Sequence, residues 1–284
     1  MSDTFPSLVS TDWLADHLAD DDLVVIDATR HLPAANRDAA REYETGHIPG
    51  ARFFDLESLV DTASSVPAAL PTAEQLAKRL ASLGIGAGDR IVIYDDSEVK
   101  TSARAWFVLR ASGFDDAAIL DGGIAKWRDE GREIKSGGAV VEEVAGPDLH
   151  PPADVATKAG ILAHLDTQSA QIVDARSADR VFGAGEDPVH GGANGRIPGS
   201  LNVPFGDLFA QDGTFKAPDD LRAVFERAGV DLTRPVITTC GSGVTASVVL
   251  FALHLIGIDD VRLYDGSWLE WSADPATPKA QGPA

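Results

Sequence analysis

The sequence predicts an α/β protein built from two similar domains, each a mainly parallel β-sheet with helices on both of its faces. Three observations lead to this prediction. The chain has 284 residues, short motifs of its first half recur in its second half, and short β-branched runs alternate with segments of helical spacing. Alternation of strands and helices is typical of parallel sheets, because the connecting helices cover the faces of the sheet.

Three unrelated motifs repeat at nearly one spacing. V-V-I-D-A returns as Q-I-V-D-A, G-H-I-P-G-A returns as G-R-I-P-G-S, and L-D-G-G returns as Y-D-G-S. Equivalent residues are 147, 149 and 144 positions apart in the pairs Asp27 and Asp174, Ile48 and Ile197, and Asp121 and Asp265. Three coincidences at one spacing indicate a duplicated unit.

The segment between the two copies predicts a domain boundary near residue 146. Residues 137–152 read G-G-A-V-V-E-E-V-A-G-P-D-L-H-P-P, and a stretch with Gly at one end and paired Pro at the other is typical of an exposed linker. We therefore predict one domain over residues 1–146 and a second over residues 147–284.

Local patterns predict particular elements within each half. Ile91–Ile93 is a short apolar run that predicts a buried strand. Pro71–Leu83 carries leucines at helical spacing, and Thr72 with Gln75 forms a capping box at its start. The second half offers Pro218–Ala228 as a comparable helix.

Composition excludes several classes of protein. The chain has 24 Lys and Arg against 44 Asp and Glu, a net charge of −20, which argues against nucleic acid as a partner. A single Cys excludes a disulfide framework and a thiolate-rich metal site within one chain. No apolar run approaches the roughly 20 residues of a membrane span, and the first ten residues do not resemble a secretory signal. We expect a cytoplasmic protein that binds no membrane, and the excess of Asp favours a source with high internal salt.

The single cysteine stands at the position where parallel sheets bind ligands. Val236–Thr239 predicts a buried strand, Cys240 follows it, and the residues after C-G-S-G-V-T predict a helix. Glycines let a ligand approach the main chain, and N–H groups at a helix start bind anions and favour a thiolate. The pattern predicts a nucleophilic Cys240 in an anion cradle whose binding residues are Gly241, Gly243, Val244 and Thr245.

Phosphoryl transfer and sulfur transfer are the two main chemistries of such a loop. Phosphatases with a loop cysteine place an Arg six positions later to grip the phosphate, and this chain has Ala246 there. The segment Cys240–Thr245 contains no Lys or Arg. A persulfide held by backbone N–H groups needs no such cation, so the residues favour sulfur transfer.

The motifs C-G-S-G-V-T, G-H-I-P-G-A and Y-D-G-S-W resemble those of the tandem-domain rhodanese family, and in particular its 3-mercaptopyruvate sulfurtransferase branch. The resemblance implies two rhodanese-like domains with the active site in the cleft between them. Domain 147–284 would be catalytic. Domain 1–146 would be inactive, because Asp95 stands 145 positions before Cys240, where a cysteine would be needed.

The resemblance also implies roles for four catalytic residues. Cys240 would attack the sulfur of the donor and become a persulfide. Ser242, His47 of G-H-I-P-G and Asp38 would handle protons. The histidine has a second interpretation, as part of the turn that Gly and Pro mark around it. The acid also has alternatives at Glu42, Glu44 and Asp55.

Binding of the donor carboxylate is implied for Arg180, in the motif D-A-R-S-A-D-R-V-F. A planar guanidinium matches a carboxylate, so Lys would be a poor replacement. Relatives often carry a second arginine nine residues later, where this chain has Val189. The candidates for that second contact are His190, Arg176 and Arg196.

The neutral loop favours 3-mercaptopyruvate, a monoanion, over the dianion thiosulfate as the sulfur donor. One alternative is a thiosulfate:cyanide sulfurtransferase. A second alternative is a non-enzymatic sulfur carrier or scaffold module, and the intact Cys240 loop argues against it. No metal and no organic cofactor is implied. Because the chain has one Cys and no resolving thiol, we expect an external acceptor: a thioredoxin-like protein, a low-molecular-weight thiol or cyanide.

Overall fold

Two five-stranded parallel sheets form the framework of the protein. The computed structural model describes residues 5–183 and 185–282. The first sheet has the strand order β1-β5-β4-β2-β3 and the second the order β6-β10-β9-β7-β8, and every recorded pairing of named strands is parallel. The two orders correspond strand for strand, which confirms the predicted fold and the predicted repeat.

The first sheet and its helices come from the first half of the chain. Its strands are β1 (Leu8–Val9), β2 (Leu23–Asp27), β3 (Arg52–Phe53), β4 (Arg90–Tyr94) and β5 (Ala117–Leu120). Its helices are α1 (Thr11–His17), α2 (Ala39–Thr45), α3 (Ala73–Ser82), α4 (Ser102–Ala111) and α5 (Gly123–Asp129), with a 3₁₀ turn η1 (Pro33–Ala35).

The second sheet repeats this arrangement. Its strands are β6 (Val155–Ala156), β7 (Gln171–Asp174), β8 (Leu201–Asn202), β9 (Val236–Thr239) and β10 (Val261–Tyr264). Its helices are α6 (Lys158–Thr167), α7 (Ala178–Phe182), α8 (Pro218–Arg227), α9 (Val244–Leu255) and α10 (Ser267–Ala273), with a 3₁₀ turn η2 (Phe205–Leu208).

The chain divides into two compact units by its internal contacts. Unit 1 holds the chain as far as Asp61, with Leu70–Ala153 and Ala210–Thr214, and unit 2 holds Thr62–Ala69, Asp154–Phe209 and the chain from Phe215 onwards. The predicted linker, residues 137–152, lies within unit 1 and is hydrogen-bonded to it, since the amide of Val144 donates to the carbonyl of Ala81. The predicted boundary near residue 146 falls inside that segment, and the extent of the two domains stays a prediction.

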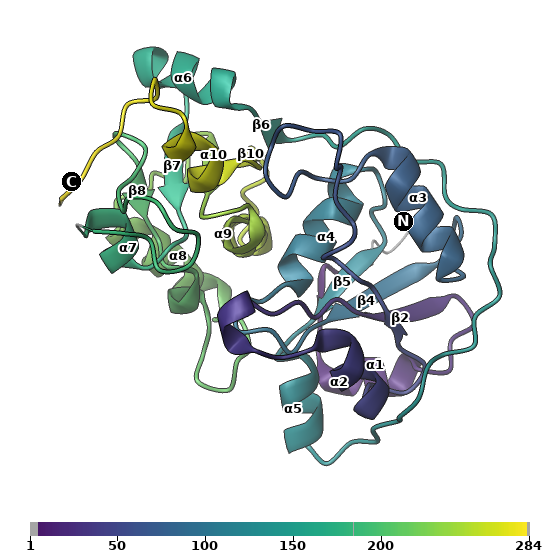
Figure 1. Ribbon diagram of the computed structural model, residues 1–284. Helices are drawn as coiled ribbons and strands as arrows, with labels where there is room; N and C mark the ends of the chain where they lie inside the picture. The colour runs from purple at the N-terminus through teal and green to yellow at the C-terminus, as the bar shows by residue number, and fades with distance from the viewer. Residues whose placement is uncertain (1–4, 184, 283–284) are drawn as a thin grey trace. The chain divides into compact units, whose positions relative to one another are not determined.

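Helices cover both faces of the sheet in unit 1. Figure 1 shows α3 and α4 on one side of β2, β4 and β5, and α1, α2 and α5 on the other. Alternate strand residues serve the two faces, so Val25 and Val92 pack with Leu14, Tyr43 and Trp127 in one buried apolar cluster. The same logic holds in unit 2, where a cluster joins strands β7, β9 and β10 to α6 and α10.

The helices and strands predicted from local patterns are present. Strand β4 contains Ile91–Ile93, and β9 coincides with Val236–Thr239. The capping box of α3 is complete: the amide of Gln75 donates to Oγ1 of Thr72 (3.2 Å), and the amide of Thr72 donates to Oε1 of Gln75 (2.8 Å). Two amides that the helix start would leave unpaired are therefore satisfied.

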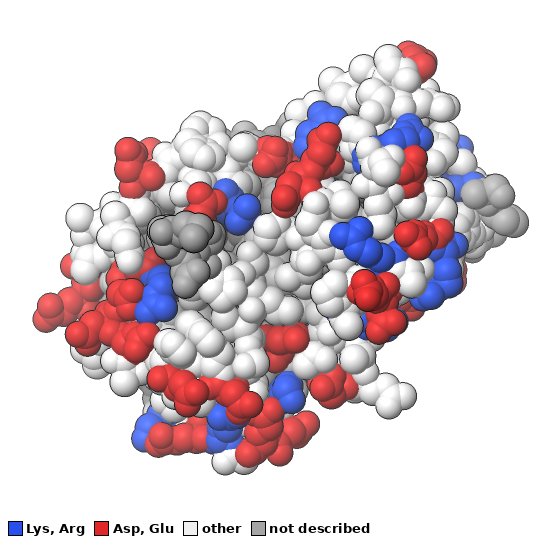
Figure 2. Space-filling model, turned by 180° about the vertical axis from the view of Figure 1, so that it is seen from behind, with Lys and Arg blue, Asp and Glu red and all other residues white. Residues whose placement is uncertain are grey.

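Acidic side chains gather in several groups on the surface, with Lys and Arg among them (Figure 2). Salt screens the charges that are exposed in this way. A high-salt source stays a prediction. Among residues 5–183 and 185–282, no helix combines the length and apolarity required to cross a membrane.

We predict that Thr72→Ala destabilises the protein by about 1 kcal/mol, because the first turn of α3 loses the acceptor for its Gln75 amide. Thr72→Ser is the matched control, since it keeps the hydroxyl. Urea denaturation followed by far-UV circular dichroism measures both. An Ala variant that unfolds at the wild-type urea concentration would contradict the role assigned to this cap.

Candidate active site

Cys240 lies at the carboxyl end of β9, between that strand and the start of α9. Its side chain is buried, with the residue 2% exposed, and it is the single cysteine of the chain. Gly243 caps α9 with a φ of +79°, a conformation that favours glycine. The local backbone therefore turns from strand to helix within three residues after the thiol.

Ser267 fixes the backbone of this loop. Its hydroxyl oxygen accepts hydrogen bonds from the amides of Cys240 (3.2 Å) and Gly243 (3.1 Å), and it donates to the carbonyl of Tyr264 (2.8 Å). Ser267 is fully buried and has a φ of +51°, which is uncommon for a residue with a side chain. The tight backbone conformation brings the hydroxyl onto two amides that would otherwise be buried without a partner.

The first residues of α10 fix the carbonyl groups of the loop. The amide of Trp268 donates to the carbonyl of Cys240 (2.9 Å), and the amide of Leu269 donates to the carbonyl of Gly241 (2.9 Å). Together with Ser267, these bonds hold both the N–H and the C=O groups of the loop, so its shape is set by β9 and α10 rather than by solvent.

Four amides of the loop remain available to a ligand. Within the described part of the chain, no acceptor is recorded for the N–H groups of Gly241, Ser242, Val244 and Thr245. They stand at the N-terminus of α9, a helix of 12 residues, where the helix dipole adds to their attraction for negative charge. This part of the backbone has the chemistry of an anion site.

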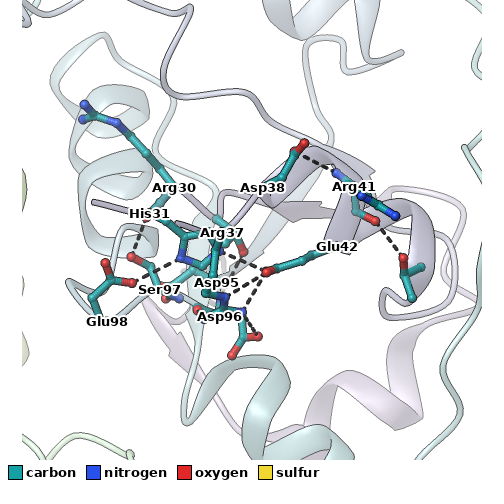
Figure 3. A network of polar contacts seen from close by, with 12 residues as sticks. Arg30, His31, Arg37, Asp38, Arg41, Glu42, Asp95, Asp96, Ser97 and Glu98 are labelled. Atoms are coloured by element: carbon teal, nitrogen blue, oxygen red, sulfur yellow. Dashed lines mark hydrogen bonds and ion pairs between the residues drawn. The ribbon is translucent and has the colours of Figure 1, made fainter. Parts of the chain in front are cut away.

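The equivalent loop of unit 1 already holds an anion, the carboxylate of Asp95. The amide of Ser97 donates to its Oδ1 (2.8 Å), and the amide of Ser102 donates to its Oδ2 (2.8 Å). Figure 3 shows Asp95 and Ser97 together at this end of the sheet. Ser97 follows Asp95 by two positions, as Ser242 follows Cys240. An anionic group on residue 240 would by this comparison be directed to the amide of Ser242.

Arg180 is held by a buried carboxylate. Its Nε and Nη2 donate to Oδ1 (3.1 Å) and Oδ2 (2.7 Å) of Asp187, whose side chain is fully buried. Burial raises the pKa of Asp187, but hydrogen bonds from Arg180 and from the amide of Val189 outweigh it and leave the pKa below its ordinary value. Sequence reasoning missed Asp187, because nothing in its neighbourhood pairs it with Arg180.

Gly241 is the meeting point of Arg180 and His190. A Cβ atom at Gly241 would lie 2.0 Å from Nε2 of His190 and 3.3 Å from Nη2 of Arg180. Any larger residue would push the imidazole away, so the glycine is required by this close approach. Within unit 2 the structure therefore brings together the cysteine loop, the predicted carboxylate anchor and one of the three candidates for a second contact.

The other two candidates have structural surroundings. The guanidinium of Arg176 is fully buried, pairs with Asp174 (Nη2 to Oδ2, 2.7 Å) and stacks on the ring of Trp268 at 4.8 Å. Arg196 donates to the carbonyl of Gly282, and its guanidinium lies 4.9 Å from the ring centre of Phe182.

Asp38 and His47 belong to unit 1, and each has a partner there. Oδ1 of Asp38 accepts from the amide of Arg41 (3.1 Å), so this carboxylate caps α2 (Figure 3). Nδ1 of His47 donates to the carbonyl of Tyr43 (2.8 Å), and the two rings stack at 4.3 Å. A carbonyl can only accept, so Nδ1 carries a proton and the neutral ring has its lone pair on Nε2. His47 is 5% exposed.

The alternative acids of the predicted relay are engaged differently. Glu42 accepts from Arg37 (2.7 Å) and lies 3.0 Å from Nε2 of His31 (Figure 3), and the hydrogen bonds from Arg37 are the main reason why its pKa is lowered. Asp55 accepts from the amides of Glu57 and Ser58, whereas Glu44 is exposed. Among the described residues, no three His, Cys, Asp or Glu side chains are grouped as metal ligands.

Known proteins are similar to this chain in sequence and in fold. The sequence model of the Rhodanese-like domain matches residues 10–130 and 157–274. The chain is 40% identical over 273 residues to 3-mercaptopyruvate sulfurtransferase of Mus musculus, covering 94% of this chain and 92% of the relative. It is 37% identical over 287 residues to thiosulfate sulfurtransferase of Bos taurus, covering 98% and 96%. The crystal structure of SseA from Escherichia coli, a 3-mercaptopyruvate sulfotransferase by its description, superposes with a TM-score of 0.81 at 38% identity, covering 92% of this chain and 98% of SseA.

We predict that Ser267→Ala lowers the free energy of unfolding by about 1–3 kcal/mol, because the amides of Cys240 and Gly243 lose their buried acceptor. Ser267→Gly removes the same hydroxyl but permits the positive φ, so it should cost less than Ala. Chemical denaturation of both variants tests this order. Ser242→Ala is the stability control, because no hydrogen bond of its hydroxyl is recorded among the described residues.

Proposed function

This chain belongs to the family of proteins with Rhodanese-like domains, and from that premise we propose that it moves a sulfane sulfur from 3-mercaptopyruvate through a persulfide on Cys240 to an acceptor, releasing pyruvate. Its relatives in Mus musculus and Escherichia coli are named for that donor. The proposal depends above all on one observation, the four amides beside Cys240 that have no acceptor within the described protein.

The proposed first step exchanges one bond to sulfur for another. The Cys240 thiolate attacks the sulfur of the donor, an S–S bond forms, and the C–S bond breaks. The electron pair of that bond goes to carbon 3 of the product, which takes the proton of the donor thiol and becomes pyruvate. The amides of Gly241, Ser242, Val244 and Thr245 suit the negative sulfur that remains on Cys240.

Other residues have proposed roles in binding and proton transfer. Arg180 attracts the carboxylate of the donor, and its place beside Gly241 supports this. Ser242 and His47 are proposed to carry the proton from sulfur to carbon, with Asp38 as the acid of this relay. The lone pair on Nε2 of neutral His47 suits such a role.

The choice of donor is proposed from charge. The loop Cys240–Thr245 has no Lys or Arg, so a monoanion fits it better than the dianion thiosulfate. Thiosulfate is the alternative donor, and the relative in Bos taurus is named for it. A thioredoxin-like protein, a small thiol or cyanide is proposed as the acceptor, because the chain has no second thiol to discharge the persulfide. A cytoplasmic location stays a proposal that rests on the sequence alone.

Intact-mass analysis tests the nucleophile and the donor together. We expect 3-mercaptopyruvate to add the mass of one sulfur atom to the protein, a thiol to remove it, and thiosulfate to load the protein more slowly. Cys240→Ser should gain no sulfur and should lose at least about 10³-fold in turnover, because it lacks the attacking thiolate. Unchanged turnover in this variant would refute the proposal, and faster loading from thiosulfate would reverse the order of donors.

Two substitutions at Asp38 separate a catalytic role from its cap. Asn is as good an N-cap as Asp, so Asp38→Asn should keep the stability of α2 but lower kcat/KM by about 10²-fold or more if the carboxylate serves the relay. Asp38→Ala should in addition cost about 1 kcal/mol of stability. Glu226→Gln, at an exposed position of α8 that has no proposed role in the relay, is the control. If Asp38→Asn keeps the kcat/KM of the wild type, Asp38 has no role in the relay and serves only as the N-cap of α2.

A further inference from the structure

Unit 2 contains a cavity at the edge of its sheet where the strands begin. Its volume is about 470 Å³, a size within the range of small-molecule sites. Gln171 opens β7, Leu201 opens β8 and Arg234 lies two residues before β9, and all three line the cavity. Cys240 follows the opposite end of β9, and no residue of its loop belongs to the lining. The cavity is therefore distinct from the cysteine loop.

The wall of this cavity combines carbon surface with a few polar groups. Leu165 of α6, Ile172 of β7 and Pro198 of the turn before β8 supply apolar surface. Among the described residues of the lining, none is an Asp or a Glu. The whole chain has 44 acidic residues and a net charge of −20, so a wall without carboxylates stands out from the rest of the protein. Its charge and its apolarity suit a ligand that is both anionic and apolar.

His164 places a hydrogen-bond donor in this wall. The residue is 9% exposed, and its Nδ1 lies 3.3 Å from the amide nitrogen of Ala170. An amide can only donate, so Nδ1 is the acceptor and the neutral ring carries its proton on Nε2. Burial lowers the pKa of His164, and the charges of Arg234 and Arg262 lower it further, which favours this neutral form. Within the described protein no acceptor is recorded for Nε2.

Arg234 adds a permanent positive charge. It is exposed, and in the described part of the chain its guanidinium has one recorded acceptor, the carbonyl of Gln168, at 2.9 Å from Nη2. The nearby carboxylate of Asp231 is directed elsewhere, because its Oδ1 accepts from the hydroxyl (2.6 Å) and the amide (2.9 Å) of Thr233. Further N–H groups of Arg234 are therefore available to a ligand.

We propose that this cavity binds a small molecule that carries a single carboxylate on a flat apolar body. The carboxylate accepts hydrogen bonds from the guanidinium of Arg234 and from Nε2 of His164, and the apolar body lies against Leu165 and Ile172. A carboxylate is favoured over a phosphate, because the wall supplies one permanent charge and its carbon surface solvates a dianion poorly. This site goes beyond the proposed function, since it uses neither Cys240 nor a sulfur donor.

Binding of 2-naphthoate tests this proposal, with 2-naphthalenemethanol as the uncharged compound of similar shape. In titrations of the full chain followed by ligand-observed NMR, we expect a Kd of about 1 mM or tighter for the naphthoate. The alcohol should bind at least about tenfold more weakly, because it forms no charge-assisted hydrogen bonds. Protein alkylated with iodoacetamide, which intact mass verifies at the single Cys, should bind 2-naphthoate as well as the unmodified protein.

Substitutions at the exposed Arg234 locate the ligand without disturbing the core. Arg234→Gln should weaken binding of 2-naphthoate about tenfold, and Arg234→Glu should weaken it further, because the new carboxylate repels the ligand. Arg227→Gln is the matched control and should bind like the wild type, because it removes an exposed arginine of α8 that does not line the cavity. His164→Phe keeps a flat ring but lacks the Nε2 donor, so it should weaken binding by about threefold or more. If His164→Phe does not fold, the two Arg234 variants decide the test.

Three results would overturn this inference. The first is a wild-type affinity in Arg234→Glu, and the second is equal affinity for the naphthoate and the alcohol. The third is loss of binding after alkylation of Cys240, which would assign the naphthoate to the cysteine loop instead. No step of the test involves sulfur transfer, so its outcome is independent of the proposed function.

Discussion

The hydrogen bonds of Ser267 are the constraint on which the cysteine loop depends. A loop that turns from a buried strand into a buried helix within three residues exposes several backbone amides to an interior without water, where unpaired amides are costly. Ser267 pairs the amides of Cys240 and Gly243. Because the first turn of α10 pairs the carbonyls of Cys240 and Gly241, the loop has no freedom to turn its other amides elsewhere. They are left for a ligand.

The comparison of the two units shows how one backbone design serves two purposes. In unit 1 the side chain that follows strand β4 is itself an anion, because the carboxylate of Asp95 accepts hydrogen bonds from the amides of Ser97 and Ser102. Gly123, with a φ of +59°, stands where unit 2 has Ser267, and a Cβ there would lie 2.6 Å from the carbonyl of Asp95. The carboxylate of Asp95, a side chain of the loop itself, accepts the hydrogen bonds of these loop amides. A cysteine leaves them open until it carries an anionic sulfur.

Amide recognition also suits a chain with a net charge of −20. Amides attract an anion over a short range and need no excess of cations, so an acidic surface is compatible with the proposed anion site at the loop. The paired row of Asp174, Arg176, Asp187 and Arg180 follows the same principle, because buried ions are tolerated when they are matched.

Local patterns were sufficient for the fold and for the place of Cys240 in it. The period of apolar residues predicted strands and helices, the repeat predicted two equivalent sheets, and Thr72 with Gln75 predicted the cap of α3, because each of these depends on neighbours along the chain. Cys240 at a strand end followed from the same reasoning. The pairing of Arg180 with Asp187, the bonds of Ser267 and the approach of His190 to Gly241 were decided by the tertiary structure alone. These contacts join residues from different loops and elements, and no spacing in the sequence specifies which side chains the packing of a parallel sheet brings together.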